Sequence, residues 1–509
     1  MKNLAKVFSA ELEGIHAQLI EVEVDIHVGL HAFTIVGLAD KSLSEAKERV
    51  NSALKNSDIK PPNKENRKIT VNLAPADVKK TGSQYDLAIA AGYLLASQQI
   101  KEFDTKGKMF IGELSLEGTL RGVNGALNIA ELAKELGFTS LFLPAENAKE
   151  ASILKGIEVI PVHTLTELIA HLEKKSPIAP MTANFETTLA RSTIDISEIK
   201  GQENAKRALM IAAAGGHNML MVGPPGSGKS ILAQSINSIV PPPSLEEAIE
   251  ITKIYSAAGL NKNGLRTERP FRSPHQTTSP VAIIGGGQNP KPGEISLSHR
   301  GVLFLDELPE FRRDLLEALR QPLETGVAHV SRAKKTLQFP AKFTLVAAMN
   351  PCPCGYFGDT EKACRCTAHE VYRYQKKISG PLLDRIDIQI NVPRLPLEEL
   401  QRESQPASGD GIRKKIVHAR AIQKERFADT SPRIHTNSEM STKQCEIHLA
   451  LEEKEKNFLK TTLEKSFISP RGYYRILKTA RTIADLEGSE KVSMAHLAEA
   501  FGYRVRQEN

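Results

Sequence analysis

Long apolar runs are missing from this 509-residue sequence. No stretch reaches the roughly 18 apolar residues that a membrane-spanning helix needs, so we expect no such helix. The opening residues, MKNLAKVFSAELEG, lack both the apolar core and the small-residue cleavage site of a secretion signal. We therefore expect a cytoplasmic protein without membrane contact.

Cysteine is also scarce, with 5 residues in the whole chain, which excludes a disulfide scaffold. In a cytosolic protein, a tight cysteine cluster indicates a metal site or chance more often than a disulfide. Internal repeats and low-complexity tracts are absent from the sequence as well. The hydrophobic share of 40% and charged share of 25% are ordinary for a soluble globular protein, and the length predicts roughly two to four domains.

The net charge of +7 is distributed unevenly. Residues 1–172 carry a net charge of −3, and the remainder of the chain carries +10. A basic rear two-thirds is compatible with a polyanionic partner, although charged surface in contact with water explains it equally well.

The sequence divides into three main parts. Residues 1–172 form the first, and 173–193, rich in Pro, Thr, Ser and Lys without a clear period, read as a linker. Residues 194–400 alternate strand-like apolar runs with helical stretches, which is typical of a parallel α/β sheet. A polar hinge at 401–412 precedes 413–509, whose helical spacing predicts a helical lid.

The stretch MLMVGPPGSGKS predicts a nucleotide-binding loop, because it reads as a strand, a glycine-rich turn and a Lys-Ser pair that opens a helix. Successive backbone N–H groups of such a loop curl around the β-phosphate, while Lys229 neutralises the β- and γ-phosphate oxygens. The hydroxyl of Ser230 can bind Mg²⁺. We expect ATP to contact Gly223, Pro224, Pro225, Gly226, Ser227, Gly228, Lys229 and Ser230.

Two further strand ends supply the expected chemistry. Asp306 and Glu307 follow the apolar run 302–305, at the carboxyl end of a strand, where ligands of open α/β sheets bind. We expect Asp306 to hold the Mg²⁺ shell together with Ser230, and Glu307 to polarise the attacking water. Asn350 ends the run FTLVAAMN and can orient that water or sense the γ-phosphate. These residues predict an ATPase of the AAA+ class.

Several motifs resemble the magnesium-chelatase ATPase subunit and, more closely, its DNA-handling relatives of the ComM/YifB family. They are GPPGSGKS, FRSPHQTTSPVAIIGGG, PGEISLSHRGVLFLDELPEF, AAMNPCPCGYFGD, RYQKKISGPLLDRID and RGYYRILKTARTIADLEG, and the resemblance covers nearly the whole chain. It implies an AAA+ P-loop NTPase core with a helical lid, assembled as a homo-oligomeric ring, a hexamer. It also implies branch migration of DNA during natural transformation.

The resemblance assigns two arginines. It implies that Arg385, in LLDRID, is an arginine finger supplied to a neighbouring subunit, and that Arg471, in SPRGYYR, is a second phosphate sensor. The alternative for Arg385 is an ion pair with Asp384 or Asp387 inside one subunit. One departure is Gln276, which directly follows His275. Many relatives have a second histidine at this position, so the resemblance does not support a catalytic or metal role for these two residues.

Two insertions in the core are candidate DNA contacts. The long stretch between the phosphate loop and Asp306 contains PVAIIGGGQNPKPGE, where Ile283 and Ile284 predict an exposed apolar wedge, the alternative being a buried flap. The second insertion, VAHVSRAKKTLQFPAKF, reads as two strands around a Lys-rich turn. A basic hairpin of this kind would follow single-stranded, duplex or branched DNA by its phosphates, the alternative being a solvated hairpin. Its projecting cations would be Arg332, Lys334, Lys335 and Lys342.

The front part resembles the α+β proteolytic domain of Lon-type proteases, a fold like domain 2 of ribosomal protein S5, through KKTGSQYDLAIAAG and IGELSLEGTLRGVNGALNIAELAKELG. That domain uses a Ser–Lys dyad, in which the base must lie within hydrogen-bond reach of the nucleophile. Ungapped matching puts Gln84 at the nucleophile's position, with Ser83 one place earlier, and Asn128 at the base's position. No Lys occurs between Arg121 and Ala133, so we expect a non-catalytic domain for assembly or contact.

The loop after Asn350 holds four cysteines, enough for a closed tetrahedral Zn²⁺ site that would staple this loop. His369 can replace one ligand, and free thiols or disulfides are the alternatives. The four cysteines are Cys352, Cys354, Cys364 and Cys366.

The sequence therefore predicts an ATP- and Mg²⁺-dependent DNA motor with a structural zinc clip. A protein-remodelling or metal-insertion ATPase is the alternative that the chelatase resemblance allows. The missing lysine argues against an active Lon-like protease.

Overall fold

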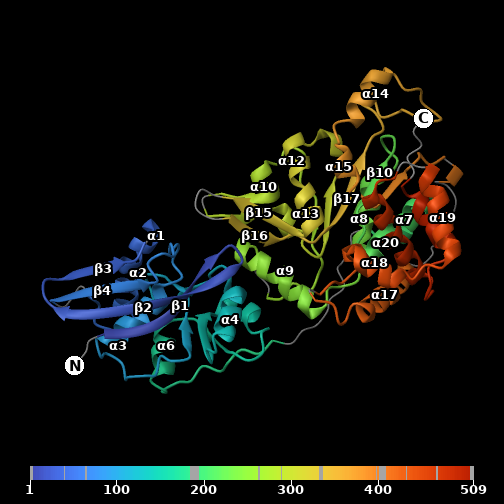
Figure 1. The fold of residues 1–509 in the computed structure, drawn as a ribbon. Helices are drawn as coiled ribbons and strands as arrows, with labels where there is room; N and C mark the ends of the chain where they lie inside the picture. Colours follow the sequence, from blue (N-terminus) through green and yellow to red (C-terminus); the bar gives the residue numbers. More distant parts are fainter. Residues whose placement is uncertain are drawn as a thin grey trace. The chain divides into compact units, whose positions relative to one another are not determined.

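The computed structural model in Figure 1 folds into two compact units. The first contains Met1–Glu186 and Leu245–Arg266, and the second contains Thr187–Ser244 and Thr267–Asn509. No described helix combines the length and the apolar character that crossing a membrane requires. The structure describes residues 4–38, 40–62, 66–183, 194–261, 264–287, 289–331, 336–396, 398–399, 409–431, 433–465 and 468–504.

The first unit is built on a seven-stranded mixed sheet with the order β3-β4-β2-β1-β5-β8-β9. β1 pairs antiparallel with β2, and β2 pairs antiparallel with β4, while the other neighbours are parallel. Along β2, buried Ile20, Val22, Val24 and Ile26 alternate with more exposed residues, as expected for a strand with one face against a core. The strands are β1 (Leu4–Glu13), β2 (His16–Val28), β3 (Ala32–Val36), β4 (Arg67–Ala74), β5 (Lys108–Phe110), β8 (Ser140–Pro144) and β9 (Glu158–Val162), with the small pair β6 (Glu113–Leu114) and β7 (Leu120–Arg121).

Helices pack on this sheet through two apolar clusters, which gives the α+β architecture that the sequence predicts. One cluster gathers side chains of α2, α3 and α6, and the other gathers side chains of α4 and α5. The helices are α1 (Lys41–Ser44), α2 (Ala46–Asn56), α3 (Asp86–Ala96), α4 (Ala126–Glu135), α5 (Ala145–Ala151) and α6 (Leu165–Leu172).

A helix from the middle of the chain, α9 (Leu245–Ala258), completes the first unit beside α4 (Figure 1). The buried carboxylate of Glu150 accepts hydrogen bonds from the Ser256 hydroxyl at 3.1 Å and from the Asn261 side chain. Lys253 forms an ion pair with Glu131. These polar contacts, together with the mostly buried surface of α9, make this segment an integral part of the front unit.

The second unit contains a five-stranded parallel sheet with the order β11-β14-β17-β10-β18. The ends of β10 and β17 lie side by side, because Val222 is opposite Met349. This arrangement brings the segments after these strands to one edge of the sheet. The strands are β10 (Met219–Val222), β11 (Phe271–Arg272), β14 (Val302–Leu305), β17 (Thr344–Met349) and β18 (Ile388–Asn391).

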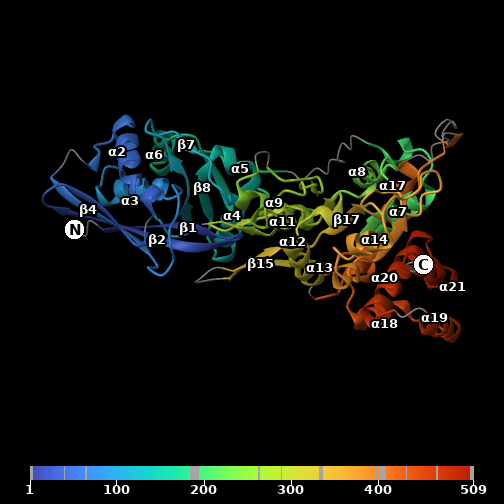
Figure 2. The same cartoon turned by 90° about the horizontal axis from the view of Figure 1, so that it is seen from above.

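Helices cover this sheet and extend into a helical C-terminal part, so the α/β P-loop core with a helical lid is confirmed. Figure 2 shows α18 to α21 grouped together. The helices of the core are α7 (Glu203–Gly215), α8 (Lys229–Ile239), α12 (Arg313–Ala318), α13 (Arg320–Thr325), α14 (Ala368–Gln375) and α15 (Gly380–Leu383). Those of the lid are α17 (Gly409–Arg426), α18 (Thr442–Leu449), α19 (Glu453–Lys465), α20 (Pro470–Leu486) and α21 (Met494–Gly502).

Two short hairpins occupy the predicted insertions of the core. β12 (Gly285–Gly286) pairs with β13 (Lys291–Pro292) between the short helices α10 (Pro280–Ile284) and α11 (Glu294–Leu297). β15 (Val327–Ser331) and β16 (Thr336–Pro340) form the antiparallel hairpin expected around the Lys-rich turn.

Candidate active site

The loop from Gly223 to Ser230 joins β10 to the N-terminus of α8. Gly226 and Gly228 have φ values of 77° and 86°, which glycine adopts without steric cost. The loop therefore turns its backbone N–H groups around the start of α8, where the helix dipole favours an anion. This is the geometry that a phosphate group requires.

Lys229 is held at the centre of this loop. Its side chain is buried, and its ammonium donates to the carbonyl oxygens of Gly223 at 2.7 Å and Pro224 at 2.9 Å. It also donates to the side-chain oxygen of Asn350 at 3.3 Å. Burial lowers the pKa of Lys229, whereas the charges of Asp306 and Glu307 oppose this shift. A phosphate anion would thus meet a cation that is already oriented.

Ser230 and the acids after β14 form the second half of the site. The Ser230 hydroxyl donates to a carboxylate oxygen of Asp306 at 2.6 Å, and the other oxygen accepts from the Glu307 backbone N–H at 2.9 Å. Hard oxygen donors of this kind suit Mg²⁺, which keeps several waters and also binds substrate phosphates. Glu307 has φ of 51°, a left-handed conformation that costs a non-glycine residue about 1–3 kcal/mol and occurs most often at functional positions.

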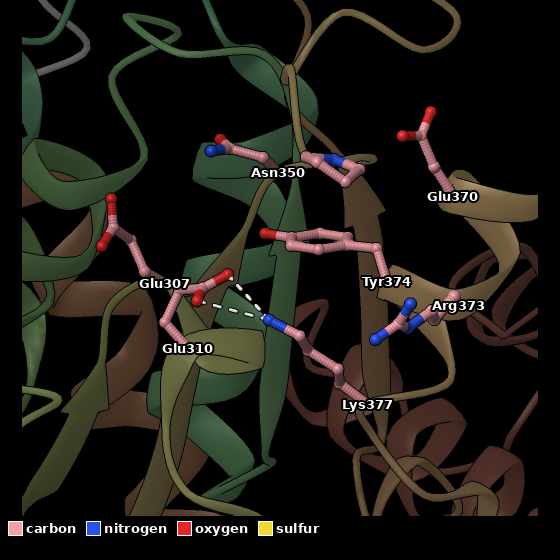
Figure 3. Close-up of a pocket in the computed structure, with 8 residues that line it drawn as sticks. Glu307, Glu310, Asn350, Glu370, Arg373, Tyr374 and Lys377 are labelled. Atoms are coloured by element: carbon pink, nitrogen blue, oxygen red, sulfur yellow. Dashed lines mark hydrogen bonds and ion pairs between the residues drawn. The ribbon is translucent and has the colours of Figure 1, made fainter. Parts of the chain in front are cut away.

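A cavity of about 650 Å³ opens beside Glu307 and Asn350 (Figure 3). Lys377 lies on its wall and donates to the two carboxylate oxygens of Glu310 at 3.2 and 3.3 Å. In Figure 3 the hydroxyl of Tyr374 points to the space between Asn350 and the two glutamates. Glu307, the candidate water-activating residue, and Tyr374 of α14 therefore line the same cavity.

Tyr374 is a residue of this cavity that the sequence did not predict. Its ring is buried, and burial, helped by the negative charges of Glu310 and Glu307, raises the pKa of Tyr374 to about 12. The hydroxyl stays protonated near neutral pH and can donate a hydrogen bond to a water or a carboxylate in the cavity. The segment RYQKKISG carries a family resemblance, but a tyrosine there has no signature of its own.

Arg385 and Arg471 converge on one carboxylate. Arg385 donates to one oxygen of Glu324, and Arg471 donates to the other. Arg385 also donates to the carbonyl of Pro381 at 2.7 Å, and its side chain is only 7% exposed. The structure thus brings the two predicted phosphate-sensing arginines together, although both are engaged within the same chain.

The alternative ion pair of Arg385 with Asp384 or Asp387 is not found among the described residues. Asp387 is buried and instead accepts hydrogen bonds from Arg475 and from the backbone N–H of Asn218 at 3.0 Å. The charge of Arg475 is the largest influence that opposes burial, and the pKa of Asp387 is held well below its ordinary value. Arg385 does pair inside the subunit, but with a more distant carboxylate than either neighbour in the sequence.

The four cysteines of the loop after Asn350 come together. Their sulfur atoms all lie within 4.8 Å of one another, and three of the separations are 3.4, 3.6 and 3.7 Å. None of the four forms a disulfide in the structure. His369, the alternative ligand, lies outside the cluster that the described residues form. The members are Cys352, Cys354, Cys364 and Cys366.

Backbone N–H groups also point at these sulfur atoms. Phe357 donates to the sulfur of Cys352 at 3.3 Å, and Cys366 donates to that of Cys364 at 3.4 Å. Backbone hydrogen bonds from Arg365 and Tyr356 lower the pKa of Cys354 to about 6. At Cys354 the donors therefore favour the thiolate, the form that binds a metal ion. Although a backbone hydrogen bond to each thiol acts in the opposite direction, burial and the neighbouring cysteine sulfurs raise the pKa of Cys364 and raise that of Cys366 to about 12.

The cysteine loop packs directly on the phosphate loop. A Cβ atom added to Gly355 would lie 2.5 Å from Cδ of Pro225, so only glycine fits at this contact. The Gln375 side chain donates to the Pro351 carbonyl at 3.0 Å and ties the loop to α14. The shape of the cysteine loop thus bears on both the phosphate loop and the wall of the cavity.

The candidate DNA contacts have a mixed outcome. Ile283 is 0% exposed, so its expected exposure is wrong, whereas Ile284 is partly exposed. The apolar side chain packs inside the insert, as in the alternative of a buried flap. Lys342 does not project freely, because its ammonium pairs with Glu439 at 3.0 Å. The other three cations of the hairpin, Arg332, Lys334 and Lys335, lie outside the described residues.

The dyad positions of the front unit are engaged in structural hydrogen bonds. Gln84 donates to the Glu11 carboxylate at 2.9 Å, and Ser83 donates to Glu113. The buried side chain of Asn128 donates to the carbonyl of Ile15 at 2.6 Å. Neither side chain at the two dyad positions has the acid–base chemistry that proteolysis by this route requires.

Comparison with known protein families covers both units. Residues 195–400 match the family described as magnesium chelatase, subunit ChlI, and residues 407–504 match its C-terminal family. Residues 22–147 match the family described as subunit ChlI of Mg-chelatase.

Two relatives align along nearly the whole chain, and a third aligns with part of it. The chain is 43% identical to the competence protein ComM of Haemophilus influenzae over 513 aligned residues, which cover 99% of this chain and 98% of that protein. It is 40% identical to the uncharacterized protein YifB of Escherichia coli, with coverage of 99% and 97%. The magnesium-chelatase 38 kDa subunit of Chlorobaculum parvum is 21% identical over 347 residues, covering 61% of this chain and 89% of that subunit.

Proposed function

The chain belongs to the ComM/YifB family of magnesium-chelatase-like AAA+ proteins, and we propose that it is an ATP-driven DNA motor. In this proposal the chain assembles into a homo-oligomeric ring, a hexamer, in the cytoplasm. ATP hydrolysis drives it along DNA, and it migrates branched recombination intermediates during natural transformation.

The observation that carries the ATPase part is the convergence of five residues from three strand ends. Lys229 and Ser230 follow β10, Asp306 and Glu307 follow β14, and Asn350 follows β17. Their contacts suit a Mg²⁺-bound nucleoside triphosphate, with Ser230 and Asp306 as metal ligands. Glu307, next to the cavity that Tyr374 lines, would activate the attacking water.

Support for DNA as the partner is the relationship to a competence protein along the full chain. A protein-remodelling or metal-insertion ATPase is the second candidate, because the family matches carry the magnesium-chelatase description. An active Lon-like protease is disfavoured, since Gln84 and Asn128 occupy the expected dyad positions.

The experiment that separates these functions is ATP turnover with and without single-stranded, duplex and forked DNA. We expect DNA to stimulate turnover, and forked or branched DNA to be remodelled only when ATP is hydrolysed. The Lys229→Ala variant is the matched control for contaminating ATPases. The second candidate would be favoured if DNA did not change ATP turnover, whereas a protein or a metalloporphyrin precursor stimulated it.

We also propose that the four clustered cysteines hold one structural Zn²⁺. In a tetrahedral site with Zn–S bonds of about 2.3 Å, the sulfur atoms lie about 3.8 Å apart. Three of the six separations, 3.4, 3.6 and 3.7 Å, are close to this value, and the others are at most 4.8 Å. The ion would brace the loop that packs on Pro225, and it has no place in the reaction itself.

A further inference from the structure

Glu324 joins three separate elements of the second unit. It lies on α13, while Arg385 follows α15 and Arg471 lies in the first turn of the lid helix α20. Both guanidinium groups donate to its carboxylate, one to each oxygen. The carboxylate is therefore the shared partner of the two arginines that the family resemblance implicates in sensing phosphate.

The exposure of the three side chains is unequal. The side chain of Arg385 is 7% exposed, whereas those of Glu324 and Arg471 are 45% and 46% exposed. The Nε of Arg385 is buried without a hydrogen-bond partner in the described part of the chain. Since Arg385 is nearly buried and already donates to Glu324, an outside anion would bind it by taking the place of this carboxylate.

Two guanidinium groups side by side repel each other unless an anion lies between them. Here Glu324 is that anion, and the hydrogen bond from Arg385, followed by the charges of Arg385, Arg471 and Arg475, lowers the pKa of Glu324. A terminal phosphate is tetrahedral and carries more charge, but two of its oxygens can accept a pair of hydrogen bonds as the two carboxylate oxygens do, and arginine binds both kinds of group. The two anions would thus compete for one receptor.

We propose that Glu324 is a positioning residue that keeps Arg385 and Arg471 together as one forked anion receptor. The terminal phosphate of ATP bound to a neighbouring copy of this chain would take the place of the carboxylate. The inference rests on the proposed role of Arg385 at the interface between subunits, and it extends that role to Arg471, which contacts the same carboxylate. The new element is that Glu324 of the same chain occupies the two arginines first, and that the terminal phosphate binds them by replacing this carboxylate.

The exchange has a consequence for the lid. Arg471 belongs to the lid, whereas Glu324 and Arg385 belong to the core, so the carboxylate fastens one to the other. Arg475, one turn further along α20, remains paired with the buried Asp387. When phosphate replaces Glu324, the first turn of α20 exchanges its contact with α13 for a contact with the neighbour's nucleotide, while the next turn stays attached to Asp387. The nucleotide of one subunit would in this way adjust the lid of its neighbour.

The test replaces Glu324 by Gln, which keeps the shape and removes the charge. With no carboxylate to displace, ATP-induced assembly should occur at a roughly two- to fivefold lower protein concentration, the factor that an ion pair of this exposure is worth. Binding of a fluorescent ATP analogue to the dilute single subunit should not change. The matched control is Glu317→Gln, which removes another carboxylate paired with an arginine, at 2.6 Å, and should leave the assembly midpoint in place.

A double-mutant cycle separates exchange from a general loss of structure. In an Arg385→Ala or Arg471→Ala background, Glu324→Gln should no longer shift the assembly midpoint. If Glu324→Gln assembles like the parent, or less readily, while Arg385→Ala loses turnover, the exchange is wrong and the proposed role of Arg385 stands. If both arginine variants assemble and hydrolyse ATP like the parent, the proposed role of the arginines at the interface is wrong, and the exchange proposal that depends on it is wrong as well. Should Glu324→Gln not fold, Glu324→Asp must show a smaller shift in the same direction, and an unchanged or opposite shift overturns the exchange.

Discussion

Lys229 and Asn350 are 121 positions apart in the sequence and are joined by a hydrogen bond of 3.3 Å. The contact exists because β10 and β17 are parallel neighbours that end at the same level. It places a cation that binds phosphate next to a polar group that can sense one. A change at the γ-phosphate can therefore reach the loop after Asn350 through a single hydrogen bond.

The first prediction separates binding from hydrolysis at this site. Lys229→Ala should weaken ATP binding, because the cation that faces the phosphates is removed. Glu307→Gln should bind ATP like the parent but stall hydrolysis, because an amide cannot activate water. Equilibrium binding of a fluorescent ATP analogue and phosphate release measure the two effects, with Lys206→Ala, a partly buried lysine paired with the exposed Glu203, as the control. Normal turnover by Glu307→Gln would contradict the assignment.

The second prediction concerns Arg385 as an arginine finger. Arg385→Ala should leave ATP binding to a single subunit intact but lower turnover by on the order of 10³, as expected for a finger supplied in trans. When Arg385→Ala subunits are mixed with Lys229→Ala subunits, shared interfaces regain one intact site, and some turnover should return. The absence of rescue at every mixing ratio would argue against action between subunits.

The sequence indicated which residues meet at the ends of β10, β14 and β17, because each part of this candidate site is local. Lys229 and Ser230 follow a strand and open a helix, and Asp306 and Asn350 end apolar runs, so their meeting follows from a parallel sheet alone. Glu324 has no such signature, and its link to Arg385 depends on how α13 and α15 pack.

Packing also explains the failures. Ile283 lies in an apolar run that reads equally well as an exposed wedge or as a buried side chain, and the packing of the insert decides the outcome. The place of α9 in the front unit was not predicted, because local sequence predicts an insertion without indicating the element that it contacts. The hydrogen bond between Ser256 and Glu150, 106 positions apart, has no counterpart in any sequence pattern.

The third prediction is that zinc copurifies with the chain at about one ion per subunit, as in other four-cysteine structural sites. Replacing Cys352 and Cys364 together by Ser should lower the thermal unfolding temperature more than it changes ATP affinity, since the ion braces a loop and touches no phosphate. Cys445→Ser, at the buried cysteine outside the cluster, is the control for a general effect of losing a thiol. Elemental analysis of protein purified without a metal affinity step, with no zinc found, would remove the proposal.

The fourth prediction is a pH effect at the junction of core and lid. Although burial acts in the opposite direction, the charges of Arg300 and Lys342 hold the pKa of Glu439 below its ordinary value of 4.5. A carboxyl group with a lowered folded-state pKa stabilises the fold fully above its unfolded-state value, and this stabilisation is lost as the pH falls through the folded-state pKa. Stability should therefore decline below about pH 4.5, and Glu439→Gln should show a shallower decline.

At neutral pH, Glu439→Gln should lower the free energy of unfolding by about 2 kcal/mol, because two charge-assisted contacts are weakened. Urea unfolding between pH 3 and pH 7 measures both effects. The control is Glu452→Gln, which removes an exposed ion pair with Lys491 and should leave stability unchanged. A parent-like slope with pH in Glu439→Gln would show that this carboxylate does not carry the acid sensitivity.

The last prediction is that the hairpin of β15 and β16 carries DNA through the ring. The two strands pair with Ser331 opposite Thr336, and the residues that connect them, which include Lys334 and Lys335, lie outside the described residues. The hairpin leads directly into β17, which ends at Asn350, the partner of Lys229. A change at the γ-phosphate can therefore be transmitted along β17 to the base of the hairpin, and hydrolysis can move its tip.

Replacing Lys334 and Lys335 by Ala should weaken binding to all DNA sequences about equally, because interactions with phosphates carry no sequence information. The slope of log affinity against log salt on duplex DNA should fall by roughly two, at about 0.9 for each phosphate that is no longer neutralised. ATP affinity should not change, and branch migration should fall further than binding, since each step needs the grip of the hairpin. The control removes the same charge from the exposed surface of α19, at Lys454 and Lys460. If the hairpin variant migrates branched DNA at the parent rate, the hairpin is a solvated surface feature, and the ring grips DNA elsewhere.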